Sequence, residues 1–177
     1  KLGKQYKVTS PYGWRIHPVE KTKKHHNGVD LWGAAETIYV ESAYDGKVIF
    51  AGPSKMKNPD GSVGGFGYHV QVLSRENGMW IVNNYAHFKP GSIKVKVGQQ
   101  IEAGTVLGIM GASGMVTARH LHWETCIGKT YKWSGNGKGY LDPIKFLKAV
   151  IARHEAVQEA LVETPDNGSV QPAPTHA

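Results

Sequence analysis

Short apolar runs separated by glycine-rich turns extend over most of the chain. Runs rich in β-branched and aromatic residues occupy positions 37–40, 47–50, 68–73, 79–85, 93–96, 100–101, 106–110 and 120–127. Such runs are typical of β-strands, and their spacing of roughly 8–12 residues favours an antiparallel sandwich or barrel. We therefore expect one mainly β domain, an antiparallel β-sandwich or open barrel with a groove.

Two kinds of connection interrupt the apolar runs. Glu76-Asn77-Gly78, between runs 68–73 and 79–85, predicts a tight β-hairpin. Residues 54–67 and 128–140 are longer and rich in glycine. Long loops inside a domain usually serve a function, so we expect 54–67 to form a wall of the groove.

One helix is predicted near the end of the chain. Asp142 is a good N-cap residue, and Pro143 suits the first helical position. An apolar stripe at helical spacing follows, made up of Ile144, Leu147, Ile151 and residues 157–161. From Thr164 the chain lacks periodicity and holds three prolines, so we expect a domain at 1–163 and a disordered tail or linker at 164–177.

Charge and hydropathy limit the classes of partner. The 177 residues include 21 Lys and Arg against 14 Asp and Glu, a net charge of +7, which favours an anionic partner. The basic residues are dispersed except at 21–24, which argues against nucleic acid. No apolar run approaches the ~20 residues that span a bilayer, and no signal-peptide pattern is present. Because the chain begins at Lys1, we expect a mature or excised piece of a longer protein.

Cys126 is the only cysteine, so no internal disulfide can form. A single cysteine in a strand-like run is most often a small buried hydrophobe. A cysteine nucleophile would need nearby histidines to face it.

Two of the nine histidines stand two residues apart, at His120 and His122. In a strand, both imidazoles emerge on one face about 6.6 Å apart, while Leu121 and Trp123 point into apolar packing. This arrangement suits a metal ligand beside a group that acts on metal-bound water. A surface pair of histidines is the simpler alternative.

A second cluster, His26-Asn27-Gly28-Val29-Asp30, supplies an imidazole and a carboxylate within one short segment. Gly28 argues against a helical turn and for a loop that enters a strand. Zinc accepts nitrogen and carboxylate ligands where thiolates are absent. With His122 these residues make three protein ligands and leave a fourth position open, which is the composition of a catalytic zinc site.

The order of several motifs resembles the lysostaphin/LytM-type zinc endopeptidases of peptidase family M23. These motifs are the segment 10–18 ahead of His26-x-Gly-x-Asp30, the strand pair at 39–48, Tyr85-Ala86-His87, the turns at 97–104, Gly111-Ala112-Ser113-Gly114 before His120-Leu121-His122-Trp123-Glu124, and Leu141-Asp142-Pro143. The resemblance covers about Ser10 to Leu147. It implies a zinc-dependent hydrolase that cuts peptide cross-bridges or stem peptides of bacterial peptidoglycan.

The resemblance also implies roles for individual residues. One zinc ion per chain would be held by His26, Asp30 and His122, with His87 and His120 as catalytic histidines that do not bind the metal. Glu124 could orient an imidazole or lie exposed. His25 could contact substrate, and His69 would be a strand residue near the cleft. We expect a monomer that acts outside the cell on the wall, with peptidoglycan and anionic wall polymers as partners and without membrane insertion.

Three other functions compete with this hypothesis. The turns at 97–108 also occur in biotinyl and lipoyl carrier domains of barrel-sandwich fold, but a carrier has no use for the His/Asp set. A catalytically silent wall-binding or scaffold relative would typically lack a ligand, and none is missing. A nucleic-acid binder would show salt-sensitive DNA binding.

Overall fold

The longest strands of the fold flank the Asn77–Gly78 turn. They are β7 (Tyr68–Glu76) and β8 (Met79–Phe88), which pair in antiparallel register from Glu76↔Met79 to Tyr68↔Phe88. Asn77 and Gly78 both have positive φ, at 52° and 77°, as a two-residue hairpin turn of type I′ requires. The predicted hairpin is confirmed.

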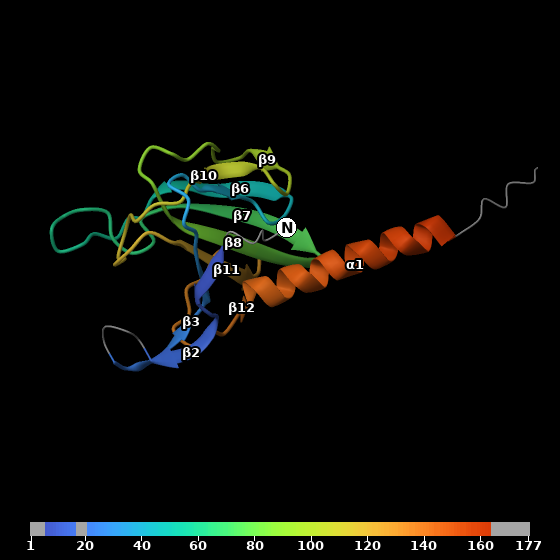
Figure 1. Ribbon diagram of the computed structural model, residues 1–177, viewed down its shortest axis with the longest axis horizontal. Coiled ribbons are helices and arrows are strands. Elements are labelled where there is room, and N and C mark those ends of the chain that lie inside the picture. Colours follow the sequence, from blue (N-terminus) through green and yellow to red (C-terminus); the bar gives the residue numbers. More distant parts are fainter. Residues whose placement is uncertain (1–5, 17–20, 164–177) are drawn as a thin grey trace, which may run out of the picture.

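The hairpin lies inside a large antiparallel sheet. The computed structural model describes residues 6–16 and 21–163, and within them the main sheet has the order β1-β4-β11-β8-β7-β6-β9, with β12 paired to β11 (Figure 1). Its other strands are β1 (Lys7–Ser10), β4 (Gly28–Trp32), β6 (Gly46–Pro53), β9 (Gln100–Ile101), β11 (Leu121–Ile127) and β12 (Tyr140–Leu141). The expectation of a mainly β, antiparallel fold is confirmed.

Two smaller antiparallel pairs complete the β structure of the described residues. β5 (Tyr39–Glu41) pairs with β10 (Val106–Ile109), and β2 (Gly13–Ile16) pairs with β3 (Lys23–His26). The β2–β3 hairpin projects from the body of the molecule (Figure 1). The β5–β10 pair lies over the main sheet. Residues 39–43, which include β5, and Met110, which follows β10, line a cavity of about 150 Å³ together with Tyr85 of β8 and Trp123 of β11.

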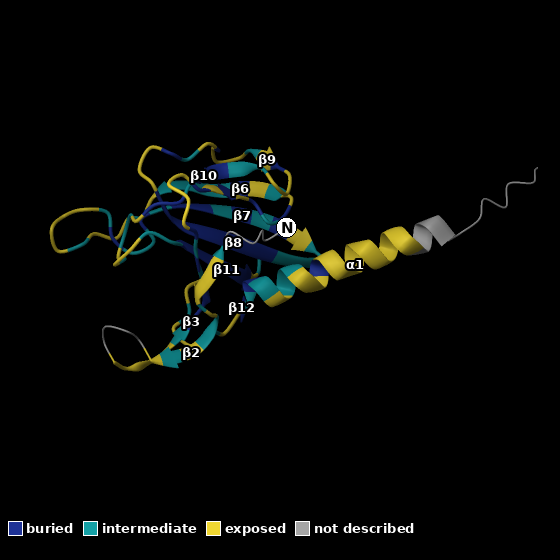
Figure 2. Ribbon diagram, viewed as in Figure 1, coloured by how far each residue is buried: buried dark blue, intermediate teal, exposed yellow. Residues whose placement is uncertain are grey.

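Alternation along β11 gives the sheet two different faces. Leu121 and Trp123 belong to the hydrophobic core, where the Trp123 ring stacks on Tyr85 with centroids 6.0 Å apart. His122 and Glu124 therefore point to the opposite face. Both central strands are buried along most of their length (Figure 2), so the polar face is covered by loops rather than open to solvent.

The helix α1 (Pro143–Glu163) starts where the sequence predicts. The Asp142 carboxylate accepts hydrogen bonds from the backbone N–H groups of Ile144 and Lys145, both at 3.1 Å. The predicted helix is confirmed, but its apolar stripe is buried only over the first two turns: Val150 is buried, whereas Ile151 and Val157 are 40% and 50% exposed. Beyond those turns the helix runs away from the sheet (Figure 1).

One strand prediction also fails. Residues 93–96 form no strand, although Val95 is buried. Lys94 N–H bonds to the Leu107 carbonyl of β10, but the segment forms no continuous ladder with that strand and is irregular chain in the structure. The expected tail at 164–177 and His17-Pro18 of the first motif lie outside the described residues. Within those residues, no helix has the length and apolar character needed to cross a membrane.

Candidate metal centre

His122 and Asp30 are direct neighbours across two paired strands. Their Cα atoms are register partners between β11 and β4, although 92 residues separate them in sequence. His26 ends β3, and a single residue links it to β4. Gly28 permits the close pairing, because a Cβ there would lie 2.3 Å from the carbonyl oxygen of Trp123. The glycine predicted to break a helix thus lets β4 approach β11.

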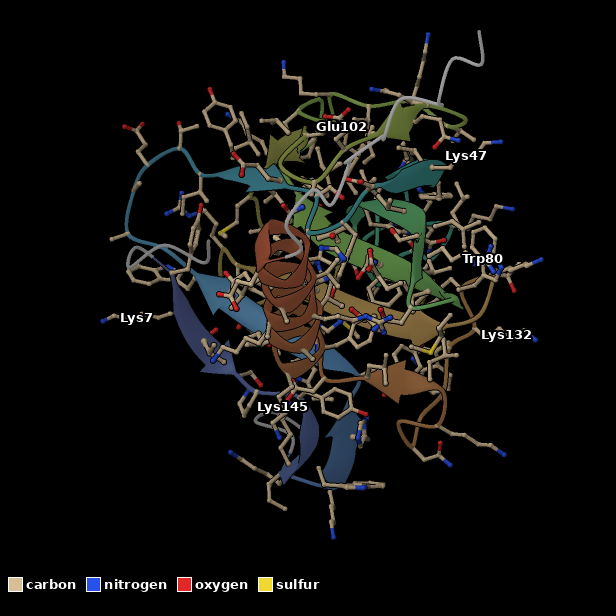
Figure 3. The ribbon with its side chains drawn as sticks, turned by 90° about the vertical axis from the view of Figure 1, so that its right-hand side faces the viewer. Lys7, Lys47, Trp80, Glu102, Lys132 and Lys145 are labelled. Atoms are coloured by element: carbon tan, nitrogen blue, oxygen red, sulfur yellow. The ribbon has the colours of Figure 1, made fainter. Side chains whose placement is uncertain are left out.

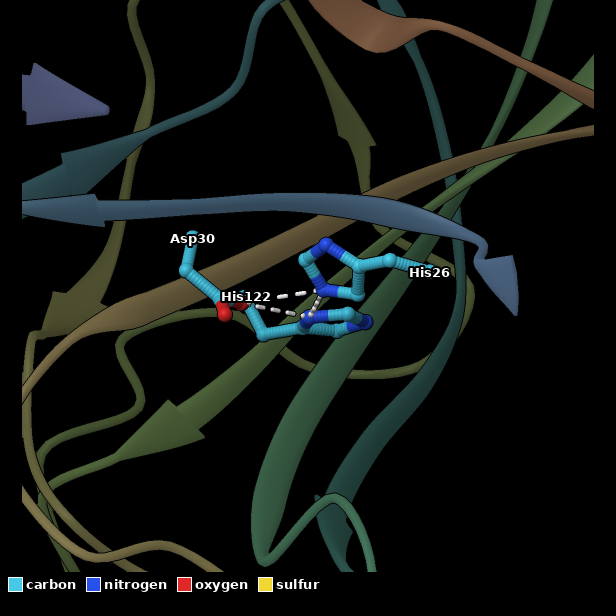
Figure 4. Close-up of side chains that lie close together, drawn as sticks. All are labelled: His26, Asp30 and His122. Atoms are coloured by element: carbon cyan, nitrogen blue, oxygen red, sulfur yellow. Dashed lines mark hydrogen bonds and ion pairs between the residues drawn. The ribbon is translucent and has the colours of Figure 1, made fainter. Parts of the chain in front are cut away.

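The three side chains converge at one point (Figure 4). His122 Nδ1 lies 2.8 Å from Asp30 Oδ1 and 3.1 Å from His26 Nε2, and the last two atoms are 3.3 Å apart. Zinc bonds of about 2.0–2.1 Å in tetrahedral geometry put ligand atoms about 3.3 Å from one another. Two imidazole nitrogens and one carboxylate oxygen at these separations therefore fit a zinc ion.

Hydrogen bonds behind the rings fix which nitrogen faces the centre. His26 Nδ1 donates to the backbone carbonyl of Pro11 at 2.8 Å, and His122 Nε2 donates to Glu124 Oε1 at 3.0 Å. His26 Nε2 and His122 Nδ1 are left to point inward, as lone pairs that bind a metal must.

Charge complementarity acts at the same centre. Burial opposes ionisation of Asp30, but hydrogen bonds from His122 and His26 hold the pKa of its carboxyl well below the usual range. Burial likewise disfavours charged His122, yet hydrogen bonds to Asp30 and Glu124 raise its pKa to about 9. In the metal-free centre, His122 thus carries a proton at the position where a metal cation fits.

Two further histidines stand beside the centre. The rings of His87 and His120 are 4.8 Å apart between centroids, and His120 Nε2 is 3.7 Å from Asp30 Oδ1. His87 Nδ1 donates to the Ser113 carbonyl at 2.8 Å, and His120 Nδ1 donates to the Ala118 carbonyl at 2.9 Å. In each ring Nδ1 is therefore engaged with the backbone, and Nε2 is the nitrogen available for proton transfer.

The backbone at His87 is in the left-handed region, with φ of 69°, which is strained for a residue with a side chain. Its N–H donates to the Phe66 carbonyl at 3.0 Å, and its carbonyl accepts from Gly111 N–H at 2.9 Å. These bonds hold the strained conformation. Burial first, then the neighbouring His122 and His120, lower the pKa of His87 to about 3.

Ser113 of the Gly-x-Ser-Gly motif fixes its loop against His87 by hydrogen bonds. Ser113 Oγ donates to the Phe88 carbonyl and accepts from Tyr68 N–H, and its carbonyl holds the His87 ring. Gly67 has a φ of 62°, and a Cβ there would lie 2.3 Å from the Ser113 carbonyl oxygen. Loop 54–67 can end beside His87 only because residue 67 is a glycine.

The structure separates the three weaker site predictions. Glu124 is buried and contacts His122, so the exposed alternative is wrong. His69 lies next to the centre but stacks on Phe50 with ring centroids 4.2 Å apart. His25 turns away from the centre: its ring bonds to Asn27 and packs edge-on against Tyr12 and Trp14.

Two aromatic residues at the centre escaped the sequence analysis. Phe66 stacks on the His122 ring with centroids 5.8 Å apart, and the Tyr131 hydroxyl bonds to Glu124. Phe66 lies in the loop 54–67 that we expected to be functional, and Tyr131 lies in the second glycine-rich segment, 128–140, for which we predicted no role. Nothing in their local sequence indicates which residue points inward.

The comparison with protein families is decisive at this point: the profile described as Peptidase family M23 matches residues 24–134, which hold both metal-site motifs. The chain belongs to peptidase family M23. The resemblance inferred from the motifs is confirmed. His26, Asp30, His87, His120 and His122 all lie within the matched segment.

Curated relatives agree with this family. The chain is 31% identical over 121 residues to the DD-carboxypeptidase/endopeptidase Mpg of Neisseria meningitidis, a match that covers 68% of this chain and 24% of Mpg. It is 32% identical over 140 residues to the glycyl-glycine endopeptidase ALE-1 of Staphylococcus capitis, covering 78% of this chain and 33% of ALE-1. The chain thus spans about a quarter to a third of the length of these relatives.

Solved structures show the same architecture. The catalytic domain of the antimicrobial peptidase lysostaphin from Staphylococcus simulans superposes with a TM-score of 0.61 and 26% sequence identity. The superposition covers 81% of this chain and 92% of that domain. The similarity is thus to the catalytic unit of a longer peptidase.

Proposed function

We propose that this chain is a zinc-dependent endopeptidase that hydrolyses peptide cross-bridges or stem peptides of bacterial peptidoglycan. The observation that carries the proposal is the convergence of His26, Asp30 and His122 beside two histidines with a free Nε2. A site with three protein ligands leaves a coordination position for water, unlike a closed structural site. The names of the relatives support the substrate class.

The chain's own residues supply positioning and proton transfer. His26, Asp30 and His122 would hold the zinc, which when bound acidifies water and polarises the scissile carbonyl. His87 and His120 both direct Nδ1 to a backbone carbonyl, so the Nε2 of one of them accepts the proton from the attacking water. The proton then passes to the leaving amine, while the other ring, with a proton on its Nε2, donates a hydrogen bond to the oxygen on which negative charge develops.

Digestion of purified cell walls tests this function. Walls of known bridge chemistry are incubated with the zinc-loaded chain, with and without a chelator, and the fragments are identified by mass spectrometry. We expect new amino termini within peptides, absent in the chelated sample. New reducing sugar ends, peptide cleavage that survives chelation, or wall binding without any cleavage would contradict the proposal, and the last result would identify a silent wall-binding relative.

The same fragments identify the scissile bond. ALE-1 is named for glycyl-glycine cleavage and Mpg for a DD-bond, so both kinds of bond occur among the relatives. Polyglycine-bridged walls and directly cross-linked walls, digested in parallel, distinguish the two.

We further propose that the enzyme acts outside the cell and that anionic wall polymers contact a basic surface of the chain. The Arg75 guanidinium carbon and Lys129 Nζ lie 5.4 and 5.2 Å from the centroid of the Trp80 ring. Lys47 lines the same surface hollow as Trp80. In Figure 3, Lys47, Trp80 and Lys132 follow one edge of the molecule.

The double variant Arg75→Gln with Lys129→Gln tests this contact. It should sediment less than the unmodified chain with intact walls, but equally with walls stripped of anionic polymers. Equal binding of the variant to both kinds of wall would contradict this contact.

A further inference from the structure

The loop between β11 and β12 returns over the polar face of the main sheet. It brings the hydroxyl of Tyr131 to Glu124 Oε2, to which it donates at 2.7 Å. Glu124 Oε1 accepts from His122 Nε2 at 3.0 Å. One carboxylate therefore links a loop tyrosine to a residue that we assign to the metal.

Glu124 has few other partners within the described part of the chain. Its side chain is 4% exposed, and it also accepts a longer hydrogen bond of 3.4 Å from Asn84 Nδ2. A buried carboxylate is costly unless both oxygens receive hydrogen bonds. The Tyr131 hydroxyl is thus the short bond that keeps Oε2 satisfied and leaves Oε1 turned toward His122.

Tyr131 also reaches His122 by a second route. The Phe66 ring stacks on His122 with a 23° angle between the planes, and Tyr131 packs edge-on against Phe66 with ring centroids 5.8 Å apart. His122, Phe66, Tyr131 and Glu124 therefore form a closed ring of contacts. A rotation of the His122 imidazole would break the Glu124 bond and unstack Phe66 together.

We propose that Tyr131 is a positioning residue that holds Glu124, and through it the His122 imidazole, in the orientation that binds the metal. The proposal rests on the proposed function for the identity of the ion as zinc. It goes beyond that function by assigning part of the metal affinity to loop 128–139, which supplies no ligand.

Removal of the hydroxyl tests the assignment. Tyr131→Phe keeps the ring on Phe66 and deletes only the bond to Glu124. Loss of a partner behind a ligating histidine typically costs 10–100-fold in metal affinity. We expect the zinc Kd of the whole chain to rise about tenfold, measured by competition with a chromophoric chelator at fixed pH, and the kcat of the zinc-saturated enzyme to fall less than the affinity.

Tyr12→Phe is the matched control. Its hydroxyl donates to the Tyr140 carbonyl at 3.2 Å, near the same loop, rather than to Glu124. We expect this variant to bind zinc like the unmodified chain. An equal loss of affinity in both variants would assign the effect to general packing and overturn the proposal.

A double-mutant cycle with Glu124→Gln adds a test that a merely structural role would not pass. If Tyr131 acts through the carboxylate, Tyr131→Phe should change zinc affinity less than about twofold once Glu124 is Gln. Independent, additive losses would contradict the proposal, as would an unchanged Kd in folded Tyr131→Phe.

Two further readouts keep the result interpretable. Urea unfolding of the metal-free variants shows whether each one folds. If Tyr131→Phe does not fold, Glu124→Gln alone must lose zinc affinity. A folded Glu124→Gln with an unchanged zinc Kd then overturns the proposal. The titration needs no substrate, so a chain that binds zinc but cleaves no wall contradicts the proposed function while the role of Tyr131 is still decided. A chain that binds no zinc contradicts both.

Discussion

Four histidines meet where β3 and β8 end and β11 begins. The hydrogen-bond partner on the outer side of each ring separates them into two roles. The rings of His26 and His122 turn different nitrogens inward, since their outer partners are the Pro11 carbonyl and Glu124. The rings of His87 and His120 are both tethered through Nδ1 to backbone carbonyls. The first pair points at Asp30, and the second stands beside it.

Alanine substitutions should therefore divide these residues into two groups. His122→Ala and Asp30→Ala remove a ligand atom, so both bound zinc and wall cleavage should be lost. His87→Ala and His120→Ala should retain about one zinc per chain while cleavage falls by roughly 10²–10⁴-fold, the usual contribution of a general acid or base. Metal analysis alongside a cleavage assay checks this, and wall lysis retained in His87→Ala would overturn its role.

Zinc binding should release a proton from His122. In the metal-free chain the pKa of His122 is raised to about 9, so below that pH the ring is charged and must lose a proton to bind. The zinc Kd should fall about tenfold per pH unit between pH 7 and 9 and then level off. Calorimetry in buffers of different ionisation enthalpy measures the released proton; no release at pH 7 would exclude the charged ring.

At the scale of single residues, the sequence motifs indicate which side chains gather at the centre. Residue type and spacing marked His26, Asp30 and the His120/His122 pair as candidates, because a strand fixes which side chains share a face. The choice of His122 as the ligand came from the resemblance to the family. The same reasoning could not place His25, which is adjacent to His26 but turns into the β2–β3 hairpin. Phe66 and Tyr131 depend on loop paths that sequence does not specify.

Among the elements, the pairing of β4 with β11 matters most to the centre. Gly28→Ala would place a Cβ 2.3 Å from the Trp123 carbonyl oxygen, so the strands must separate. We expect a loss of about 1–3 kcal/mol in unfolding free energy, as for other overpacked sites, together with weaker zinc binding.

Gly61→Ala is the control for this substitution. Gly61 has a φ of 83° and open space around it, so only the left-handed backbone cost of about 1–2 kcal/mol applies. Urea unfolding and zinc titration of both variants separate the two effects. Zinc affinity that falls equally in both would show that strand separation is not the cause.

The helix offers a matched pair of substitutions. Val150 is 4% exposed and Val157 is 50% exposed, so the same change to alanine removes buried contacts only at residue 150. We expect Val150→Ala to lower the free energy of unfolding by about 2 kcal/mol and Val157→Ala to change it by less than about 0.5 kcal/mol. Equal losses would mean that the outer turns of α1 are packed after all.

Elements were predictable where a local signal decides them. The β7–β8 turn and the start of α1 depend on Asn77-Gly78 and Asp142-Pro143, whose conformations are set by neighbouring residues. Strands β1 to β3 were missed because they are short, polar and half exposed, so they show no apolar run. Residues 93–96 show such a run, but they contact β10 through the Lys94–Leu107 backbone bond without forming a strand.

The whole molecule brings together groups that are far apart along the chain. His26 and His122 are 96 residues apart, and the sheet order β4-β11-β8 places them beside His87. Motif order predicted the family, whereas the closure of loops 54–67 and 128–139 around His122 emerges only in three dimensions. A rigid sheet with two loops over its polar face accounts for a preformed centre.

Titration of metal-free chain with zinc, while the release of amino groups from cell walls is followed, tests the central claim most directly. We predict that cleavage rises in proportion to added zinc and reaches a plateau at one ion per chain, and that Asp30→Ala stays inactive throughout. Cleavage by the metal-free chain, or a plateau at a different stoichiometry, would contradict a single zinc held by His26, Asp30 and His122.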